Sequence, residues 1–218
     1  MLTLYVGNKN YSSWSLRSWL LLRQAGISFN EKTVWLFDGI PELSKLSPAG
    51  RVPVLVDDGL VVWDTLAIAE YVAERFPEKR LWPDDVKHRA RARSVCAEMH
   101  SGFTQLRSNM PMNIEASLPG LGWNQAVQKD IDRIVAIVAE LRTVHAASGP
   151  FLCGAFTVAD AFFAPVASRF KTHAVQLPAV VQQWSDTLHA TPAMQEWTLG
   201  ALAEKRYLPE DEPYRASN

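Results

Sequence analysis

Cysteine is scarce in this sequence of 218 residues, which contains only Cys96 and Cys153. These two lie far apart and form no Cys-x-x-Cys pair, which excludes a disulfide scaffold and a zinc ribbon. The five histidines form no His-x-x-x-His or His-x-x-Glu arrangement, so we expect no metal site. So little cysteine suits a reducing compartment, and we expect a cytoplasmic protein.

Long apolar runs and an excess of one charge are also missing. No stretch reaches roughly 18 uninterrupted apolar residues, and residues 1–5 carry no basic segment before an apolar one, so we expect neither a membrane span nor a signal peptide. The 22 basic and 23 acidic side chains nearly balance, which argues against nucleic acid as a partner. The basic run at 88–93 is interpreted as a solvated helix face or a dimer rim. Hydrolase and nucleotide-binding motifs such as Gly-x-Ser-x-Gly and Gly-x-Gly-x-x-Gly are absent.

The first 80 residues alternate strand patterns with helix patterns. Two strand patterns joined by a helix predict a parallel pair, and the Asp58-Gly59 turn predicts a hairpin that adds antiparallel strands. The predicted elements are a strand at 2–6, a helix at 13–25, a strand at 29–36, a hairpin at 52–63 and a helix that opens at Asp64 and Thr65.

Composition changes where Pro77 and Pro83 bracket a charged stretch, and we expect a linker there. Nearly everything beyond it has helical periodicity. The predicted helices cover residues 87–110, 123–147, 158–171, 178–190 and 193–203. The sequence therefore predicts an α/β domain over 1–80 and an all-helical domain over 84–218.

Pro53 is the first candidate for chemistry. Because proline cannot donate to a sheet ladder, it belongs at a strand start or an edge, which leaves the backbone of Val52 free to pair with an extended peptide. The Val52–Pro53 bond is also a candidate for the cis form. The alternative is a proline that simply starts a strand.

Asp64 and Thr65 are the second candidate. The start of a helix favours an anion, the Thr65 hydroxyl adds a donor, and Asp64 can hold an ammonium group. Together they would suit the zwitterionic head of an amino acid. The alternative is an ordinary helix cap.

The serine-rich turn before the first helix is the third candidate, with Ser12, Ser13 and Ser15. A hydroxyl at a helix N-terminus can donate to a thiolate, and lowering a thiol pKa of about 8.5 by two units requires about 2.7 kcal/mol of stabilisation. The alternative is again a cap followed by a polar turn.

These motifs, in this order, resemble the glutathione transferase superfamily over the whole chain. The matching segments are residues 11–17, 47–55, 63–71 and 154–160, the most specific being Gly-x-Val-Pro-x-Leu and the acid–hydroxyl pair before Ala-Ile. The resemblance implies a thioredoxin-like N-terminal domain and an all-α C-terminal bundle. In the second domain Thr157 and Asp160 would form a capping box.

The resemblance also implies how glutathione binds. Val52, before a cis Pro53, would pair its backbone with the cysteinyl unit, and Asp64 and Thr65 would bind the γ-glutamyl end; the family more often has Glu or Gln with Ser there. Ser12 would stabilise the thiolate, with Ser13 second in rank and Ser15 a distant third. The turn holds no cysteine, which argues against members that form mixed disulfides with glutathione.

The turn is similar to that of the zeta class, which includes maleylacetoacetate isomerases. In the second domain four side chains fall at helical spacing on one face and would form a mainly apolar pocket with a cationic end, suited to an anionic electrophile: His100, Phe103, Arg107 and Met110. The alternative is plain packing between domains. Trp14 and Trp35 are expected to border the cleft.

We therefore expect a cytoplasmic glutathione transferase that delivers the thiolate to a small electrophile, as in detoxification. One alternative is a maleylacetoacetate-type cis–trans isomerase, and another is a non-enzymatic binding or regulatory protein of this fold. The resemblance also implies a homodimer that packs residues 65–71 against 90–96.

Overall fold

The computed structural model describes residues 1–36 and 41–215 and contains a four-stranded sheet followed by a helical part. Its first elements are β1 (Leu2–Val6), α1 (Ser13–Gln24), β2 (Asn30–Thr33), α2 (Pro41–Leu46), β3 (Val54–Asp57), β4 (Leu60–Trp63), α3 (Thr65–Arg75) and a 3-10 turn, η1 (Pro77–Lys79). The helical part consists of α4 (Val86–Ser101), α5 (Thr104–Asn109), α6 (Gln125–His145), η2 (Ala146–Ser148), α7 (Val158–Thr172), α8 (Ala179–His189), α9 (Pro192–Glu204) and η3 (Pro209–Asp211). None of the described helices is long and apolar enough to cross a membrane.

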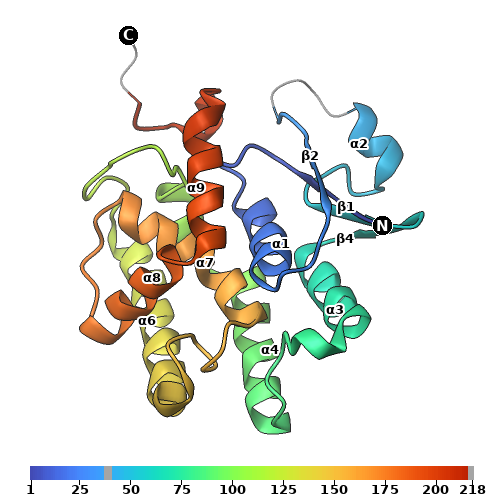
Figure 1. Cartoon of the computed structure of the whole chain (residues 1–218). Helices are drawn as coiled ribbons and strands as arrows, with labels where there is room; N and C mark the ends of the chain where they lie inside the picture. The colour runs from blue at the N-terminus through green and yellow to red at the C-terminus, as the bar shows by residue number, and fades with distance from the viewer. Residues whose placement is uncertain (37–40, 216–218) are drawn as a thin grey trace.

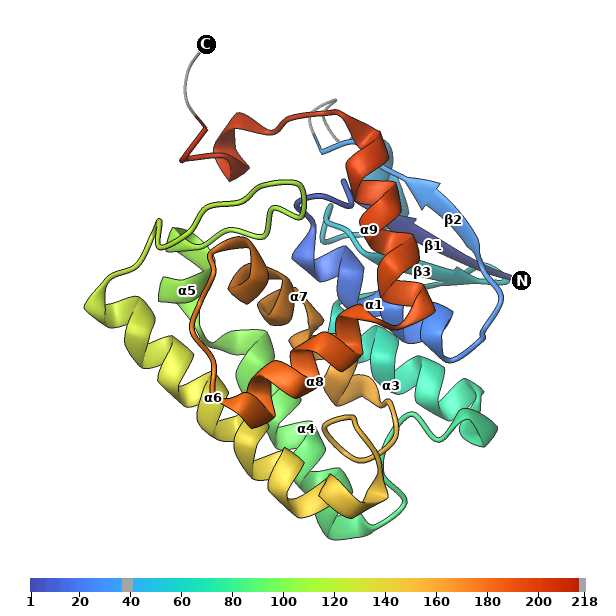
Figure 2. The same ribbon diagram turned by 60° about the vertical axis from the view of Figure 1, so that its left-hand side comes forward.

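The sheet has the strand order β2-β1-β3-β4; β2, β1 and β4 are labelled in Figure 1 and β3 in Figure 2. β1 pairs with β2 in parallel and with β3 in antiparallel orientation, and β3 pairs with β4 across the turn at Asp58 and Gly59. Both residues of that turn have positive φ, as a tight hairpin requires. The predicted strand, helix, strand and hairpin are thus confirmed, although β2 is shorter than residues 29–36.

α1 lies between the sheet and the helical part, where it contacts β1, α3, α7 and α9 (Figures 1 and 2). Its side chains Leu16, Trp19, Leu20 and Leu22 are buried without exposure, because helical spacing directs them both to the sheet and to α7. One continuous core therefore joins the two parts of the chain. The α/β and all-helical fold class expected from the sequence is confirmed, while the division at 80–84 stays a prediction.

The predicted helix at 87–110 is wrong in one respect: the chain forms two helices. α4 ends at Ser101 with Gly102 as its C-cap, and Phe103 then has φ +60°, so the chain changes direction before α5. A Cβ atom on residue 102 would lie 2.8 Å from the Glu98 carbonyl oxygen, which explains the glycine. Apolar spacing continues through this break, and the sequence pattern alone therefore predicts one helix.

The capping box at the start of α7 is confirmed. The Asp160 carboxylate accepts the backbone N–H of Thr157 at 3.0 Å, and its other oxygen accepts hydrogen bonds from the Leu152 N–H at 2.9 Å and the Trp184 indole at 3.0 Å. Asp160 is fully buried. It thus links the loop before α7, the helix itself and α8.

Candidate active site

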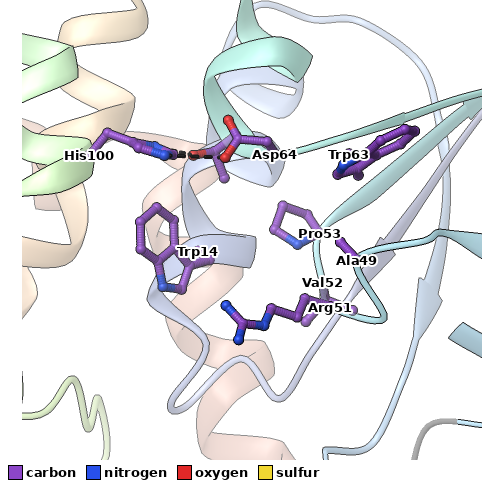
Figure 3. Close-up of a pocket in the computed structure, with 9 residues that line it drawn as sticks. Trp14, Ala49, Arg51, Val52, Pro53, Trp63, Asp64 and His100 are labelled. Carbon is purple, nitrogen blue, oxygen red and sulfur yellow. Dashed lines mark hydrogen bonds and ion pairs between the residues drawn. The ribbon is translucent and has the colours of Figure 1, made fainter. Parts of the chain in front are cut away.

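Two adjoining cavities lie between the sheet and the helical part. The first encloses about 490 Å³ and is lined by Trp14, Ala49, Arg51, Val52, Pro53, Trp63, Asp64, Thr65 and His100 (Figure 3). The second encloses about 380 Å³ and is lined by Tyr11, Ser12, Ser13, Trp14, Leu36, Gly50, Arg51, Val52, Arg107, Pro111, Met112, Arg169 and Asp211. Because Trp14, Arg51 and Val52 line both, one ligand can extend from the first cavity into the second.

Val52 lies at the junction of the two cavities. The peptide bond between Val52 and Pro53 is cis, as the sequence suggested. Pairing of β3 with β1 begins at Val54, so Val52 lies just outside the sheet ladder. An extended ligand that passes this point could therefore pair with the Val52 backbone as an added strand would.

The start of α3 forms one end of the first cavity. Asp64 caps the helix: its Oδ1 accepts the backbone N–H of Leu66 at 2.8 Å and that of Ala67 at 3.4 Å. The Asp64 backbone has a φ of +71°, which is rare for a residue with a side chain. Its carboxylate lines the cavity and is about half exposed. Thr65 follows and is buried. An acid, a hydroxyl and a helix N-terminus thus lie together.

His100, predicted to share one pocket with Arg107, lines the first cavity, whereas Arg107 lines the second. From the last turn of α4 the His100 Nε2 lies 3.2 Å from Asp64 Oδ2 and its Nδ1 3.4 Å from Thr65 Oγ1 (Figure 3). Its ring packs edge-on against Trp14, with centroids 5.0 Å apart. Burial lowers the pKa of His100, and the nearby Arg17 and Arg107 lower it further against the opposing effect of Asp64.

The serine turn opens into the second cavity at the start of α1. Ser12 is the N-cap; its hydroxyl accepts the Ser15 N–H at 3.4 Å and donates to Ser15 Oγ at 2.8 Å. Within the described ranges the Ser13 hydroxyl has no hydrogen-bond partner, and both side chains are 7% exposed toward the cavity. Ser15 is fully buried, and its Oγ accepts the Gly7 N–H at 2.9 Å. Ser12 and Ser13 can therefore reach a ligand, whereas Ser15 supports the turn.

Guanidinium groups dominate the charge of the second cavity. Arg107 from α5 and Arg169 from α7 line it with Arg51, and among the described lining residues Asp211 is the one that is acidic. Arg169 is almost fully buried, which lowers its pKa to about 9, with Arg107 acting in the same direction and Asp211 against it. Burial has the opposite effect on the acid: it raises the pKa of Asp211, and the charge of Arg169 opposes this shift. Such a cavity attracts an anionic group.

Phe103 and Met110, two further members of the predicted pocket, are buried in the core and do not line either cavity. The reason is the break at Gly102 and Phe103, which rotates α5 away from the face that a continuous helix would present. Of the four predicted pocket residues, only Arg107 lines the second cavity.

Arg17 packs against Trp14, which lines both cavities, and is 1% exposed. Its guanidinium carbon lies 4.3 Å from the Trp14 ring centroid and 5.0 Å from that of Phe162. Nη2 donates to the Met99 carbonyl at 3.5 Å, while Nε and Nη1 have no partner among the described residues. Burial lowers the pKa of Arg17 well below its usual value.

Lining residues that were not predicted from the sequence as part of the site include Arg51, Trp63, Arg169 and Asp211. Arg51 stands inside a motif already singled out, and its place before Val52 is a signal that could have been used. Trp14 was expected to border the cleft and does; Trp35 does not line either cavity. No three His, Cys, Asp or Glu side chains of the described ranges gather as metal ligands would.

Comparison with known proteins identifies the family. Residues 11–75 match the model of the glutathione S-transferase N-terminal domain, and residues 124–198 match that of the C-terminal domain. A Caenorhabditis elegans protein named "Probable maleylacetoacetate isomerase" is 30% identical over 197 residues, which cover 87% of this chain and 89% of that protein. The chain belongs to the glutathione S-transferase family.

Other glutathione S-transferases agree with this assignment. "Glutathione S-transferase 1" of Dianthus caryophyllus is 42% identical over 90 residues, 40% of each chain. A glutathione transferase homolog from Burkholderia, solved with bound glutathione, superposes with a TM-score of 0.72 at 25% identity and covers 92% of this chain and 98% of its own.

Proposed function

We propose that the protein is a glutathione transferase that binds glutathione along the first cavity and delivers its sulfur to an electrophile in the second. The observation that carries this is the junction at Val52, with the acid–hydroxyl pair on one side and the serine turn on the other. Asp64 binds the α-ammonium group, while the backbone N–H of Thr65 and the start of α3 bind the α-carboxylate. The Val52 backbone pairs with the cysteinyl unit, so the sulfur points toward Ser12 and Ser13.

The chemistry is stabilisation of a thiolate. A hydroxyl donor and the N-terminus of α1 together supply about 2–3 kcal/mol, enough to lower a thiol pKa by about two units. The thiol proton leaves to solvent, the sulfur forms a bond to the electrophilic carbon, and the leaving group departs with the electron pair of its bond. No bond to the protein forms, and proximity provides much of the acceleration.

Anionic acceptors fit the second cavity best. Arg51, Arg107 and Arg169 give it a positive potential, while Trp14, Pro111 and Met112 supply apolar surface. Such a cavity also suits the alternative reaction, in which the thiolate adds to a cis-enone acid, the carbon–carbon bond rotates, and the thiolate is expelled. The C. elegans relative named as an isomerase is the observation that favours this second candidate.

Thiol ionisation tests the proposal. Ultraviolet difference spectra of bound glutathione measure the thiolate in the wild type, Ser12→Ala and Ser13→Ala, with the exposed Ser94→Ala as control. We expect the thiolate signal to fall about tenfold near neutral pH in one or both turn variants, with binding retained. Unchanged ionisation in both would refute the serine mechanism, and failure of the wild type to bind glutathione would favour a non-enzymatic role.

A pair of assays separates the two reactions. Incubation with a chloronitrobenzoate measures chloride release and glutathione consumption, as conjugation requires. Incubation with a cis-dicarboxylic keto acid measures isomerisation while glutathione stays constant. Activity in the second assay alone would assign the protein as an isomerase.

We also propose a cytoplasmic homodimer that acts on foreign or metabolic electrophiles. Within one chain Arg93 already pairs with Glu70 at 2.8 Å, and Ala92, Val95 and Cys96 are buried, so the partner can contact only the remaining exposed face of α4. Sedimentation at twice the mass of the chain is expected; a monomer would refute the dimer.

A further inference from the structure

His100 connects the helical part to the start of α3 by two polar contacts. Its Nε2 lies 3.2 Å from Asp64 Oδ2 and its Nδ1 3.4 Å from Thr65 Oγ1. The ring also packs against Trp14, which fixes the plane of the imidazole. Glutathione recognition as proposed above uses Asp64 and Thr65 and leaves this histidine without a role.

Only one neutral tautomer satisfies both contacts. Nε2 must carry the proton and donate to the carboxylate, and Nδ1 must accept the Thr65 hydroxyl proton, because a carboxylate cannot donate. Asp64 Oδ1 is meanwhile held by the Leu66 N–H at 2.8 Å. Both carboxylate oxygens are thereby fixed before a ligand arrives, and the Thr65 oxygen is oriented as well.

Protonation of His100 would disturb this arrangement. An imidazolium has no acceptor nitrogen, so the Thr65 hydroxyl would lose its partner, and the full positive charge would compete with a ligand's ammonium group for Asp64. The charged groups around the ring are Asp64 at the start of α3, Arg17 on α1 and Arg107 on α5. Arg51 lines the same cavity. Burial and the arginines favour the neutral form at pH 7.

We propose that neutral His100 is a positioning residue of the γ-glutamyl subsite, which holds Asp64 and Thr65 in the orientation that binds glutathione, and that its protonation weakens this binding. The inference rests on the proposed function and deepens it. His100 acts through Asp64 and Thr65, and it takes no part in the transfer of the sulfur.

Binding of S-methylglutathione tests the role, because this probe has no ionisable thiol. Titration calorimetry at pH 7.5, 6 and 5.5, in two buffers of different ionisation enthalpy, gives affinity and proton release for the wild type, His100→Gln and the control His88→Gln. His88 lies on the same helix, is exposed and does not line either cavity. It therefore reports the loss of a histidine elsewhere on α4.

We expect the wild type and His88→Gln to lose about three- to fivefold in affinity between pH 7.5 and 5.5, because a one-unit shift of a linked pKa gives its full tenfold effect only well below both pKa values, and to release protons on binding near pH 6. His100→Gln should bind several-fold more weakly at pH 7.5 and show neither effect. The same pH dependence and proton release in His100→Gln as in the wild type would overturn the role of His100.

A second measurement covers the case in which His100→Gln does not fold. The pKa of the His100 ring, followed by NMR in the wild type, should fall when S-methylglutathione saturates the protein; an unchanged pKa would overturn the inference. Absence of wild-type binding at pH 7.5 would instead refute the proposed function, whereas pH-independent binding would refute only the role of His100.

Discussion

Asp160 is the residue whose ionisation is most clearly coupled to the fold. Complete burial raises the pKa of this carboxyl group to about 6, although the hydrogen bonds from Leu152, Trp184 and Thr157 oppose the shift. Between about pH 4 and 6 the native protein therefore binds more protons here than the unfolded chain does. Taken by itself, the ionisation of Asp160 therefore lowers the free energy of unfolding as the pH rises from about 4 through 6.

Asp160→Asn should reveal this contribution. When the pH is lowered from 7 to 5, the free energy of unfolding of the wild type should rise by about 1 kcal/mol relative to that of the variant. Urea denaturation at each pH measures both values. Burial lowers the pKa of His145, His173 and His189, which destabilises the fold in acid, but equally in both proteins. A difference between the two proteins that stays constant with pH would contradict the prediction.

Arg17 is buried, and two of its nitrogens have no hydrogen-bond partner within residues 1–36 and 41–215. An unpaired buried polar group costs about 1–3 kcal/mol, and methionine has a similar length without that cost. We expect the free energy of unfolding of Arg17→Met, measured by urea denaturation, to equal that of the wild type or to exceed it by about 1 kcal/mol. A loss of more than 2 kcal/mol would mean that the contacts with Trp14 and Phe162 outweigh desolvation.

At the scale of elements, the break between α4 and α5 determines which side chains reach the second cavity. Gly102→Ala would place a methyl group 2.8 Å from the Glu98 carbonyl oxygen, and Arg107 Nε donates to the Gly102 carbonyl at 3.0 Å. We expect this substitution to lower the free energy of unfolding, measured by thermal denaturation, by about 1–3 kcal/mol, as at other overpacked sites. The neighbouring exposed Ser101→Ala should stay within about 0.5 kcal/mol of the wild type; an equal effect in both would contradict the steric cause.

Short-range patterns predicted most elements correctly, because turn residues such as Asp58 and Gly59 and caps such as Asp64 act locally. The break at Gly102 was missed since the apolar spacing on either side continues the same period. His100 and Arg107 were therefore expected on one face, whereas the structure places His100 in the first cavity and Arg107 in the second. Arg169 and Asp211 meet in the second cavity from distant parts of the chain, and only tertiary packing brings them together.

At the scale of the whole molecule, the segment after α9 returns to the site. Asp211 lines the second cavity, Glu212 accepts a hydrogen bond from the Tyr11 hydroxyl, and Tyr214 donates to the Asn109 carbonyl at 2.7 Å. The end of the chain thus places one negative charge near Arg169 and against the serine turn. An anionic acceptor must bind in the presence of that charge.

Asp211→Asn should therefore bind anions more tightly. Removal of a partly screened charge is worth about 1 kcal/mol, or about a fivefold gain in affinity for benzoate at low salt, measured by titration calorimetry. Glu210→Gln removes an adjacent exposed charge that does not line the cavity and should change the affinity by less than about twofold. Equal gains in both variants would assign the effect to net charge.

α1 and α9 lie side by side (Figure 2). Trp19 on α1 is fully buried and packs against Trp197 of α9, with ring centroids 5.2 Å apart, while the Trp197 indole donates to the Lys9 carbonyl at 2.9 Å. A helix at residues 192–204 thus completes the surroundings of a helix at residues 13–24. During synthesis the serine turn and α1 stay incompletely packed until α9 has left the ribosome. Ribosome-bound chains that stop before residue 192 should therefore be cut readily by protease within α1, whereas released chains that include α9 should resist.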